Sequence, residues 1–151
     1  MIASQFGCFF FDLDGVLYVG GTATPGAAET LDTLRSMGKN IRFLTNNPTM
    51  RIRIADRLRG HGIAAEMDEI ITAGSATAKY LAAERIKKAW VIGEQGLHRE
   101  IEMAGISAAG EEDCEAVVIG WDETATLAAV RRAALAIRKG ALFIATNMDR
   151  T

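Results

Sequence analysis

The sequence predicts an α/β protein with a parallel sheet, and three of its features support this class. Residues 6–11 are almost continuously apolar, as is typical of strands that helices cover on both faces. Strand-like and helix-like segments then alternate as far as residue 72, which is the pattern of a doubly wound sheet. Two of these strands end in polar side chains, and open α/β sheets place their ligands at the carboxyl ends of strands.

The first half of the chain is expected to hold three strands and two helices. After the strand at residues 6–11, glycines frame a flexible loop at 16–23. Thr24 and Pro25 predict a helix start, as N-cap and first helical residue, and Gly38 ends that helix. The remaining elements of this half are a strand at 41–44, a helix from 49 to 60 or 62, and a strand at 69–72.

Gly74-Ser75 marks the predicted boundary between two domains, although no proline-rich linker separates them. Two later strands that end in Val-Ile-Gly, at residues 91–93 and 118–120, indicate a repeated strand–helix unit. A long alanine-rich helix is expected from Thr124 to Lys139. Its apolar stripe, by helical spacing, consists of Leu127, Val130, Ala134 and Ile137.

The composition is that of an ordinary soluble protein, with 151 residues of which 49% are hydrophobic and 24% charged. The formal charge of −2 gives no indication of nucleic acid or of an acidic membrane surface as a partner. No apolar run approaches the roughly 18–20 residues of a membrane span. Cys8 and Cys114 have no ligand-like spacing, and the beginning of the chain does not resemble a secretory leader. We therefore expect a cytoplasmic protein with neither nucleic acid nor membrane as a partner.

Asp12 and Asp14 are the strongest candidates for catalysis. They stand two residues apart at the end of an apolar strand, and Gly15 follows them. Such a pair suits phosphoryl transfer, in which Asp12 attacks phosphorus and Asp14 acts as general acid and base. A divalent cation, usually Mg²⁺, must offset the repulsion between carboxylate and phosphate. Gly15 would leave backbone N–H groups free to approach phosphate oxygens, whereas the simpler interpretation of the whole run is an acidic turn.

Thr45 and Asn46 end the next strand and precede a helix, a position that suits a phosphate site. Thr45 would donate its hydroxyl and Asn46 its amide. Taken alone, the run from Thr45 to Pro48 is also typical of a turn with a helix cap. Its position one strand–helix unit after the acidic strand favours the phosphate site.

Residues 10–17, followed by residues 43–48, resemble the first two motifs of the haloacid dehalogenase-like superfamily of phosphatases. Further segments resemble its para-nitrophenyl phosphatase-like branch, whose large α/β cap is inserted after the third core strand. These segments are residues 25–27, 72–78, 91–93 and 140–149. The likeness covers essentially the whole chain.

The resemblance implies a Rossmann-like parallel sheet core, of which residues 1–73 are the N-terminal half, and an inserted α/β cap at residues 74–151 that is incomplete. It implies hydrolysis of a small phosphate ester through an aspartyl-phosphate. Asp12 is then the nucleophile and a Mg²⁺ ligand, and Asp14 is the acid/base and a Mg²⁺ ligand through its carbonyl. The two polar residues of the second motif contact the phosphate.

The sequence departs from the family pattern in two places. Met148 stands where the family typically has proline, which would alter a loop rather than the chemistry. The chain also lacks the family's third motif, a lysine, and its fourth, an acidic Gly-Asp-type loop, and no Gly-Asp pair occurs anywhere. We therefore expect impaired activity in this chain. Without the later core strands, residues 6–11 would form a sheet edge, through which we expect self-association.

Two other classes of protein stay open. One is a non-catalytic fragment or a phosphate- or partner-binding module derived from such a phosphatase. The other is a receiver-like phosphoacceptor domain, which fits less well because it would carry its aspartate on a later strand and no cap. Sugar phosphates, nucleotides, phosphoglycolate and pyridoxal phosphate all suit these motifs as substrates, because fold and motif determine the chemistry but not the leaving group.

Overall fold

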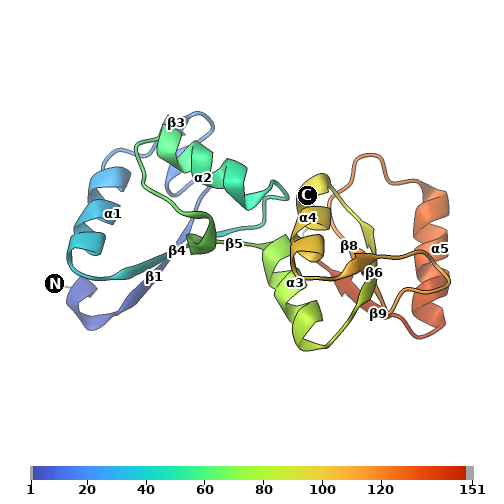
Figure 1. Cartoon of the computed structure of the whole chain (residues 1–151). Helices are drawn as coiled ribbons and strands as arrows, with labels where there is room; N and C mark the ends of the chain where they lie inside the picture. Colours follow the sequence, from blue (N-terminus) through green and yellow to red (C-terminus); the bar gives the residue numbers. More distant parts are fainter. Residues whose placement is uncertain (1, 149–151) are drawn as a thin grey trace. The chain divides into compact units, whose positions relative to one another are not determined.

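The structure, a computed structural model, describes residues 2–148. Contacts within the chain group it into two compact units (Figure 1). The first unit holds the chain up to Thr45 together with Arg51–Thr72. The second unit holds Asn46–Met50 and the chain from Ala73 onward.

The first unit is built on a three-stranded parallel sheet in the order β1-β4-β5 (Figure 1). Its strands are β1 (Cys8–Asp12), β4 (Asn40–Thr45) and β5 (Ile70–Thr72). Its helices are α1 (Ala27–Ser36) and α2 (Arg51–Gly60), with short 3₁₀ helices η1 (Ile2–Gln5) and η2 (Met67–Glu69). The predicted flexible loop contains a small hairpin formed by β2 (Tyr18–Val19) and β3 (Thr22–Ala23). The predicted α/β class and the order of its main elements are confirmed.

Helix α1 begins later than predicted. Its N-cap is Gly26, which has a left-handed φ of 79° and makes no side-chain cap. Thr24 takes part only through its carbonyl, which accepts a hydrogen bond from the N–H of Ala27 at 3.1 Å. The predicted cap at Thr24 is therefore wrong, because glycine reaches a backbone conformation that sets the helix start two residues further on.

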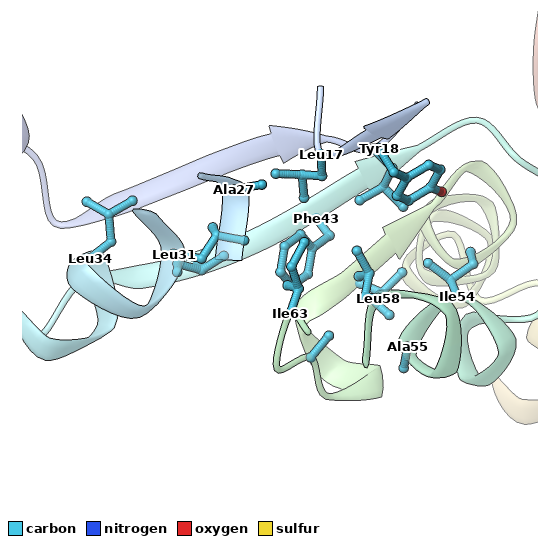
Figure 2. Packing of buried hydrophobic residues seen from close by; sticks show 14 residues of the cluster. Leu17, Tyr18, Ala27, Leu31, Leu34, Phe43, Ile54, Ala55, Leu58 and Ile63 are labelled. Atoms are coloured by element: carbon cyan, nitrogen blue, oxygen red, sulfur yellow. The ribbon is translucent and has the colours of Figure 1, made fainter. Parts of the chain in front are cut away.

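The core of the first unit lies on one face of the sheet, against α1 and α2. Ile41 and Phe43 alternate along β4, point to this face and are buried. Figure 2 shows Phe43 with Leu31 of α1 on one side and Leu58 of α2 on the other. Full burial of one such side chain contributes about 1.5–3 kcal/mol relative to its exposure, so this face holds the unit together.

The opposite face of the same sheet is uncovered within residues 2–148. Phe10 on β1 is 60% exposed, and Leu44 on the neighbouring β4 is 38% exposed. Over the part of the chain that the structure describes, β1 also pairs with β4 alone and is an edge strand, as expected for half of a core sheet. The prediction that residues 6–11 are covered on both faces is wrong for this part of the chain, because helices pack on one face only.

The second unit is built on a four-stranded parallel sheet in the order β7-β6-β8-β9. Successive residues of β8, Val117 and Val118, are buried against opposite faces of this sheet, with α5 over one face and α3 and α4 over the other (Figure 1). None of the helices within residues 2–148 has the length and apolar character needed to cross a membrane. The elements are α3 (Ala73–Ala83), β6 (Lys88–Ile92), α4 (Gln95–Met103), β7 (Ser107–Ala108), β8 (Ala116–Ile119), α5 (Leu127–Arg138) and β9 (Leu142–Ala145).

Helix α5 packs on the sheet through alanines. Ala133 and Ala136 are buried, whereas Leu127 is 85% exposed and Val130 is 45% exposed. Of the stripe that helical spacing predicted, Leu127 and Val130 are exposed, whereas Ile137 does pack against the buried alanines. The small side chains of the alanine face allow the helix to lie close to the sheet, and the larger Leu127 and Val130 remain outside.

Candidate active site

Asp12 is the last residue of β1, and its side chain is exposed. The pairing of Cα atoms places Asp12 opposite Leu44, so that Thr45 lies one residue further along β4. Thr45 in turn pairs with Thr72, the last residue of β5. The three parallel strands therefore end at one edge of the sheet, which carries a carboxylate and two threonines. Because neighbouring strands lie about 4.8 Å apart, one phosphate group can reach side chains from two of them.

A compact turn follows Asp12 and presents Asp14. The N–H of Tyr18 donates to the carbonyl of Leu13 at 3.3 Å, and the N–H of Gly15 donates to the carbonyl of Tyr18 at 2.8 Å. Gly15 has a φ of 82°, in the left-handed region, and the side chain of Asp14 is exposed. The N–H of Gly15 itself is thus already bonded within the turn. Gly15 is therefore expected to contribute to phosphate binding through the shape that it gives the turn, and not through its own N–H.

Thr45 and Asn46 differ in their surroundings. Thr45 is buried at the end of β4 in the first unit, whereas the exposed Asn46 begins the segment Asn46–Met50 of the second unit. Asn47 accepts a hydrogen bond through Oδ1 from the N–H of Thr49 at 2.9 Å, a turn that precedes α2.

Four of the predicted site residues therefore belong to the first unit, at the strand ends or in the turn that follows them. They are Asp12, Asp14, Gly15 and Thr45. Asn46 follows them in the chain, but its contacts assign it to the other unit.

Tyr18 is the residue of this region that sequence reasoning missed. Its side chain is 2% exposed and stacks on the ring of His61, with 5.2 Å between the ring centroids. Cζ of Arg57 lies 5.9 Å from the centroid of the Tyr18 ring. Burial raises the pKa of Tyr18 above its usual 10.0, a hydrogen bond with Arg57 opposes this, and the charge of Asp14 adds to it. An aromatic residue inside a glycine-rich loop was the signal that could have found it.

The oxygen donors of Asp12 and Asp14 fit a hard cation such as Mg²⁺. Within residues 2–148, no group of three or more His, Cys, Asp or Glu side chains is arranged to hold a metal. Mg²⁺ usually keeps several waters and binds through one or two carboxylates together with substrate phosphate. The two aspartates therefore fit this cation as part of its ligand set.

In the second unit, polar residues also follow a strand end, after Gly120 and the 58% exposed Trp121. Oδ1 of Asp122 accepts hydrogen bonds from the N–H and the hydroxyl of Thr124, at 2.8 and 2.7 Å. These two bonds lower the pKa of the Asp122 carboxyl below its usual 3.8. The carboxylate of Asp122 is therefore part of a local turn.

The family model of haloacid dehalogenase-like hydrolases matches residues 9–107, more than half of the chain. Sugar-phosphatase AraL of Bacillus subtilis is 40% identical over 143 residues, which cover 93% of this chain and 53% of that protein. Phosphoglycolate phosphatase 2 of Arabidopsis thaliana is 36% identical over 167 residues, which cover 93% of this chain and 56% of that protein. The chain spans about half the length of the curated relatives it matches.

Solved structures of phosphatases have the same fold. The p-nitrophenyl phosphatase from Archaeoglobus fulgidus superposes with a TM-score of 0.87 and 34% identity, over 95% of this chain and 56% of that chain. The glycerol phosphate phosphatase of Mycobacterium tuberculosis, solved in complex with magnesium, superposes with a TM-score of 0.86 and 31% identity, over 98% of this chain and 46% of that chain. The chain therefore belongs to the haloacid dehalogenase-like hydrolase family, as its two strand-end motifs predicted.

Proposed function

We propose that this chain is part of a Mg²⁺-dependent phosphatase that hydrolyses monoesters of small phosphorylated metabolites. The observation that carries the proposal is the exposed carboxylate of Asp12 at the end of β1, next to the end of β4 that bears Thr45. The names of the relatives support the reaction class, since they include a sugar-phosphatase and a phosphoglycolate phosphatase.

Asp12 is the proposed nucleophile and Asp14 the proposed acid and base. An oxygen of Asp12 attacks phosphorus, the ester P–O bond breaks, and an aspartyl-phosphate forms. Asp14 gives its proton to the leaving oxygen and then takes a proton from the water that attacks the aspartyl-phosphate. Phosphate leaves and the carboxylate of Asp12 is restored. Both side chains are exposed, so a small substrate can reach them.

The carboxylate of Asp12 and the carbonyl of Asp14 are the proposed ligands of Mg²⁺. A structural relative solved in complex with magnesium supports the choice of a divalent cation. When bound, Mg²⁺ would offset the repulsion between the attacking carboxylate and the phosphate. We assign the phosphate itself to the turn at Gly15, the hydroxyl of Thr45 and the amide of Asn46.

We assign residues 1–73 to the N-terminal half of the catalytic core and residues 74–151 to part of a cap that excludes water and selects the substrate. The division of contacts after Thr72 supports this assignment. A cytoplasmic location is also a proposal, and the free thiols of Cys8 and Cys114 support it.

The test of the reaction is Mg²⁺-dependent hydrolysis of p-nitrophenyl phosphate by this chain. We expect slow turnover, because the sequence has no Gly-Asp pair to complete the acidic site. Asp12→Asn should abolish it, and Asp14→Asn should lower kcat by about 10²–10⁴-fold. Asp32→Asn, which changes an exposed aspartate of α1, is the matched control and should leave turnover unchanged.

Two results would contradict this assignment. Hydrolysis that Asp12→Asn leaves intact would show that Asp12 is not the nucleophile. Absence of any Mg²⁺-dependent hydrolysis would favour the alternative, a non-catalytic module that binds phosphate or a partner.

We also propose that the chain self-associates through the edge formed by β1. An edge strand offers unpaired backbone groups to another chain, and Phe10 adds an exposed apolar ring at this edge. Light scattering over a range of concentrations should show a mass above that of one chain. Phe10→Lys should lower that mass, while Ile52→Lys, at an exposed position of α2, should not. A monodisperse monomer at high concentration would overturn the proposal.

A further inference from the structure

Tyr18 joins the turn that carries Asp14 to the rest of the first unit. Its carbonyl accepts the hydrogen bond from Gly15 at 2.8 Å, and its N–H donates to the carbonyl of Leu13 at 3.3 Å. An isolated β-bridge also pairs Asp14 with Tyr18. The backbone of Tyr18 therefore closes the turn, and any shift of Tyr18 is passed directly to Asp14 and Gly15.

The side chain of Tyr18 is fixed by groups from helix α2 and from the residue that follows it. His61 stacks on the ring at 5.2 Å with 28° between the ring planes, and Arg57 places its guanidinium carbon 5.9 Å from the ring centroid. A guanidinium within about 6 Å of an aromatic centroid is attracted by the ring. Tyr18 also belongs to the buried cluster that includes Ile54 and Leu58 of α2, and Figure 2 shows all three at the same end of this cluster. One ring thus holds the turn against the helix.

The charges of Asp14 and Asp12 also act on the phenol group of Tyr18. Burial raises the pKa of Tyr18, the hydrogen bond with Arg57 lowers it, and the charges of Asp14 and Asp12 raise it further. Arg57 thus adds a polar contact to the apolar packing of the ring.

We propose that Tyr18 is a positioning residue, which holds the Asp14–Gly15 turn at the end of β1 by anchoring it to Arg57 and His61. The inference rests on the proposed function, in which Asp14 is the acid and base. A turn released from this anchor would leave Asp14 at variable distances from the leaving oxygen, and misplacement by about 1 Å can cost 10²-fold in rate. The loss falls on kcat rather than KM, because Asp14 acts in the chemical step.

The first experiment compares Tyr18→Leu with Tyr18→Phe in the hydrolysis of p-nitrophenyl phosphate. Leucine removes the ring, and we expect kcat to fall by about 10-fold or more with KM within about 2-fold. Phenylalanine keeps the ring on His61 and should restore most of kcat. Tyr80→Leu, at the 50% exposed tyrosine of α3, is the control and should leave both constants unchanged.

The second experiment needs no activity and leaves the buried ring in place. Arg57→Gln removes the guanidinium from the ring, and Arg53→Gln is its matched control, since both arginines are exposed on α2. Amide hydrogen exchange of Gly15, followed by NMR, reports directly on its bond to Tyr18. We expect exchange of the Gly15 amide to be faster by about 3-fold or more in Arg57→Gln, at unchanged exchange of the β4 core amides, and unchanged in Arg53→Gln.

The two experiments separate the failure of this inference from the failure of the proposed function. Faster Gly15 exchange in an inactive chain would support the anchor and contradict the phosphatase. Gly15 exchange that is the same in Arg57→Gln and Arg53→Gln would overturn the anchor, as would a kcat that Tyr18→Leu leaves unchanged.

Discussion

Gly120 lies so close to Leu97 that a β carbon at residue 120 would stand 2.8 Å from Cδ2 of the leucine. Gly93 has the same relation to this side chain, with a distance of 2.6 Å. The two glycines follow β6 and β8, which are neighbours in the sheet, and Leu97 comes from α4. One leucine therefore packs over the ends of two strands, and the absence of a side chain at both ends provides its space.

Gly120→Ala should destabilise the second unit. The new methyl group would meet Leu97 and also Oγ1 of Thr146 at 3.0 Å, so both side chains would have to shift. Overpacking of this kind typically costs about 1–3 kcal/mol of the free energy of unfolding, which urea denaturation would measure.

Gly110→Ala is the control for this prediction, because a β carbon there meets nothing within 4 Å. Its effect should stay within about 0.5 kcal/mol. If both substitutions cost the same, close packing on Leu97 is not the reason for glycine at residue 120.

The order of strands and helices was predictable because apolar runs and helix-ending glycines are local signals. The packed face of α5 was predictable only at Ile137, because helical spacing gives weight to large apolar residues and little weight to alanine. Leu127 and Val130 define a regular stripe, yet Ala133 and Ala136 contact the sheet. The sheet leaves room for small side chains at this face of α5. The spacing of apolar residues along the helix does not reveal that restriction.

The alanine face of α5 should therefore be sensitive to size. Ala136→Leu would place a large side chain against the sheet, and we expect a loss of about 1–3 kcal/mol in the free energy of unfolding. Leu127→Ala, at the 85% exposed first residue of the helix, should change stability by less than about 0.5 kcal/mol. Thermal or urea unfolding of both variants checks this, and a larger loss from Leu127→Ala would show that the predicted stripe is the packed one.

The turn after Asp12 should not tolerate a side chain at Gly15. This residue has a φ of 82°, and a left-handed backbone costs a residue with a β carbon about 1–2 kcal/mol. Gly15→Ala should lower the free energy of unfolding by this amount, although nothing lies within 4 Å of the new methyl group. Gly21→Ala is the matched control in the same loop, since its φ is not left-handed. An equal effect at both positions would argue against backbone strain.

The candidate site was predictable to the extent that it lies at strand ends. Asp12, Asp14 and Thr45 were predicted because an apolar run that stops at polar residues is visible in the sequence itself, and all three lie in the first unit. Tyr18 was not among the predicted residues, because its contacts are with Arg57 and His61, which lie far along the chain and reach it through the packing of α2. The aromatic residue in the glycine-rich loop is visible in the sequence, but its partners have no local signal.

Glu115 should make the stability of the second unit depend on pH. Its carboxylate accepts hydrogen bonds from the backbone N–H groups of Lys87 and Lys88, and these bonds lower its pKa below the usual 4.5. A carboxyl group whose pKa is lower in the folded chain stabilises the fold above its unfolded pKa. That contribution is lost as the pH falls through the folded pKa.

Glu115→Gln should therefore lower the free energy of unfolding at neutral pH, because an amide accepts these two hydrogen bonds less strongly than a carboxylate. The difference from the unsubstituted chain should shrink below about pH 4 and vanish once the carboxyl is protonated in both states. Urea unfolding at a series of pH values measures this, with Glu123→Gln as the control at an exposed glutamate of the same unit. A difference that persists at acid pH would mean that the glutamine side chain fits this position poorly, and that the charge of Glu115 is not what stabilises it.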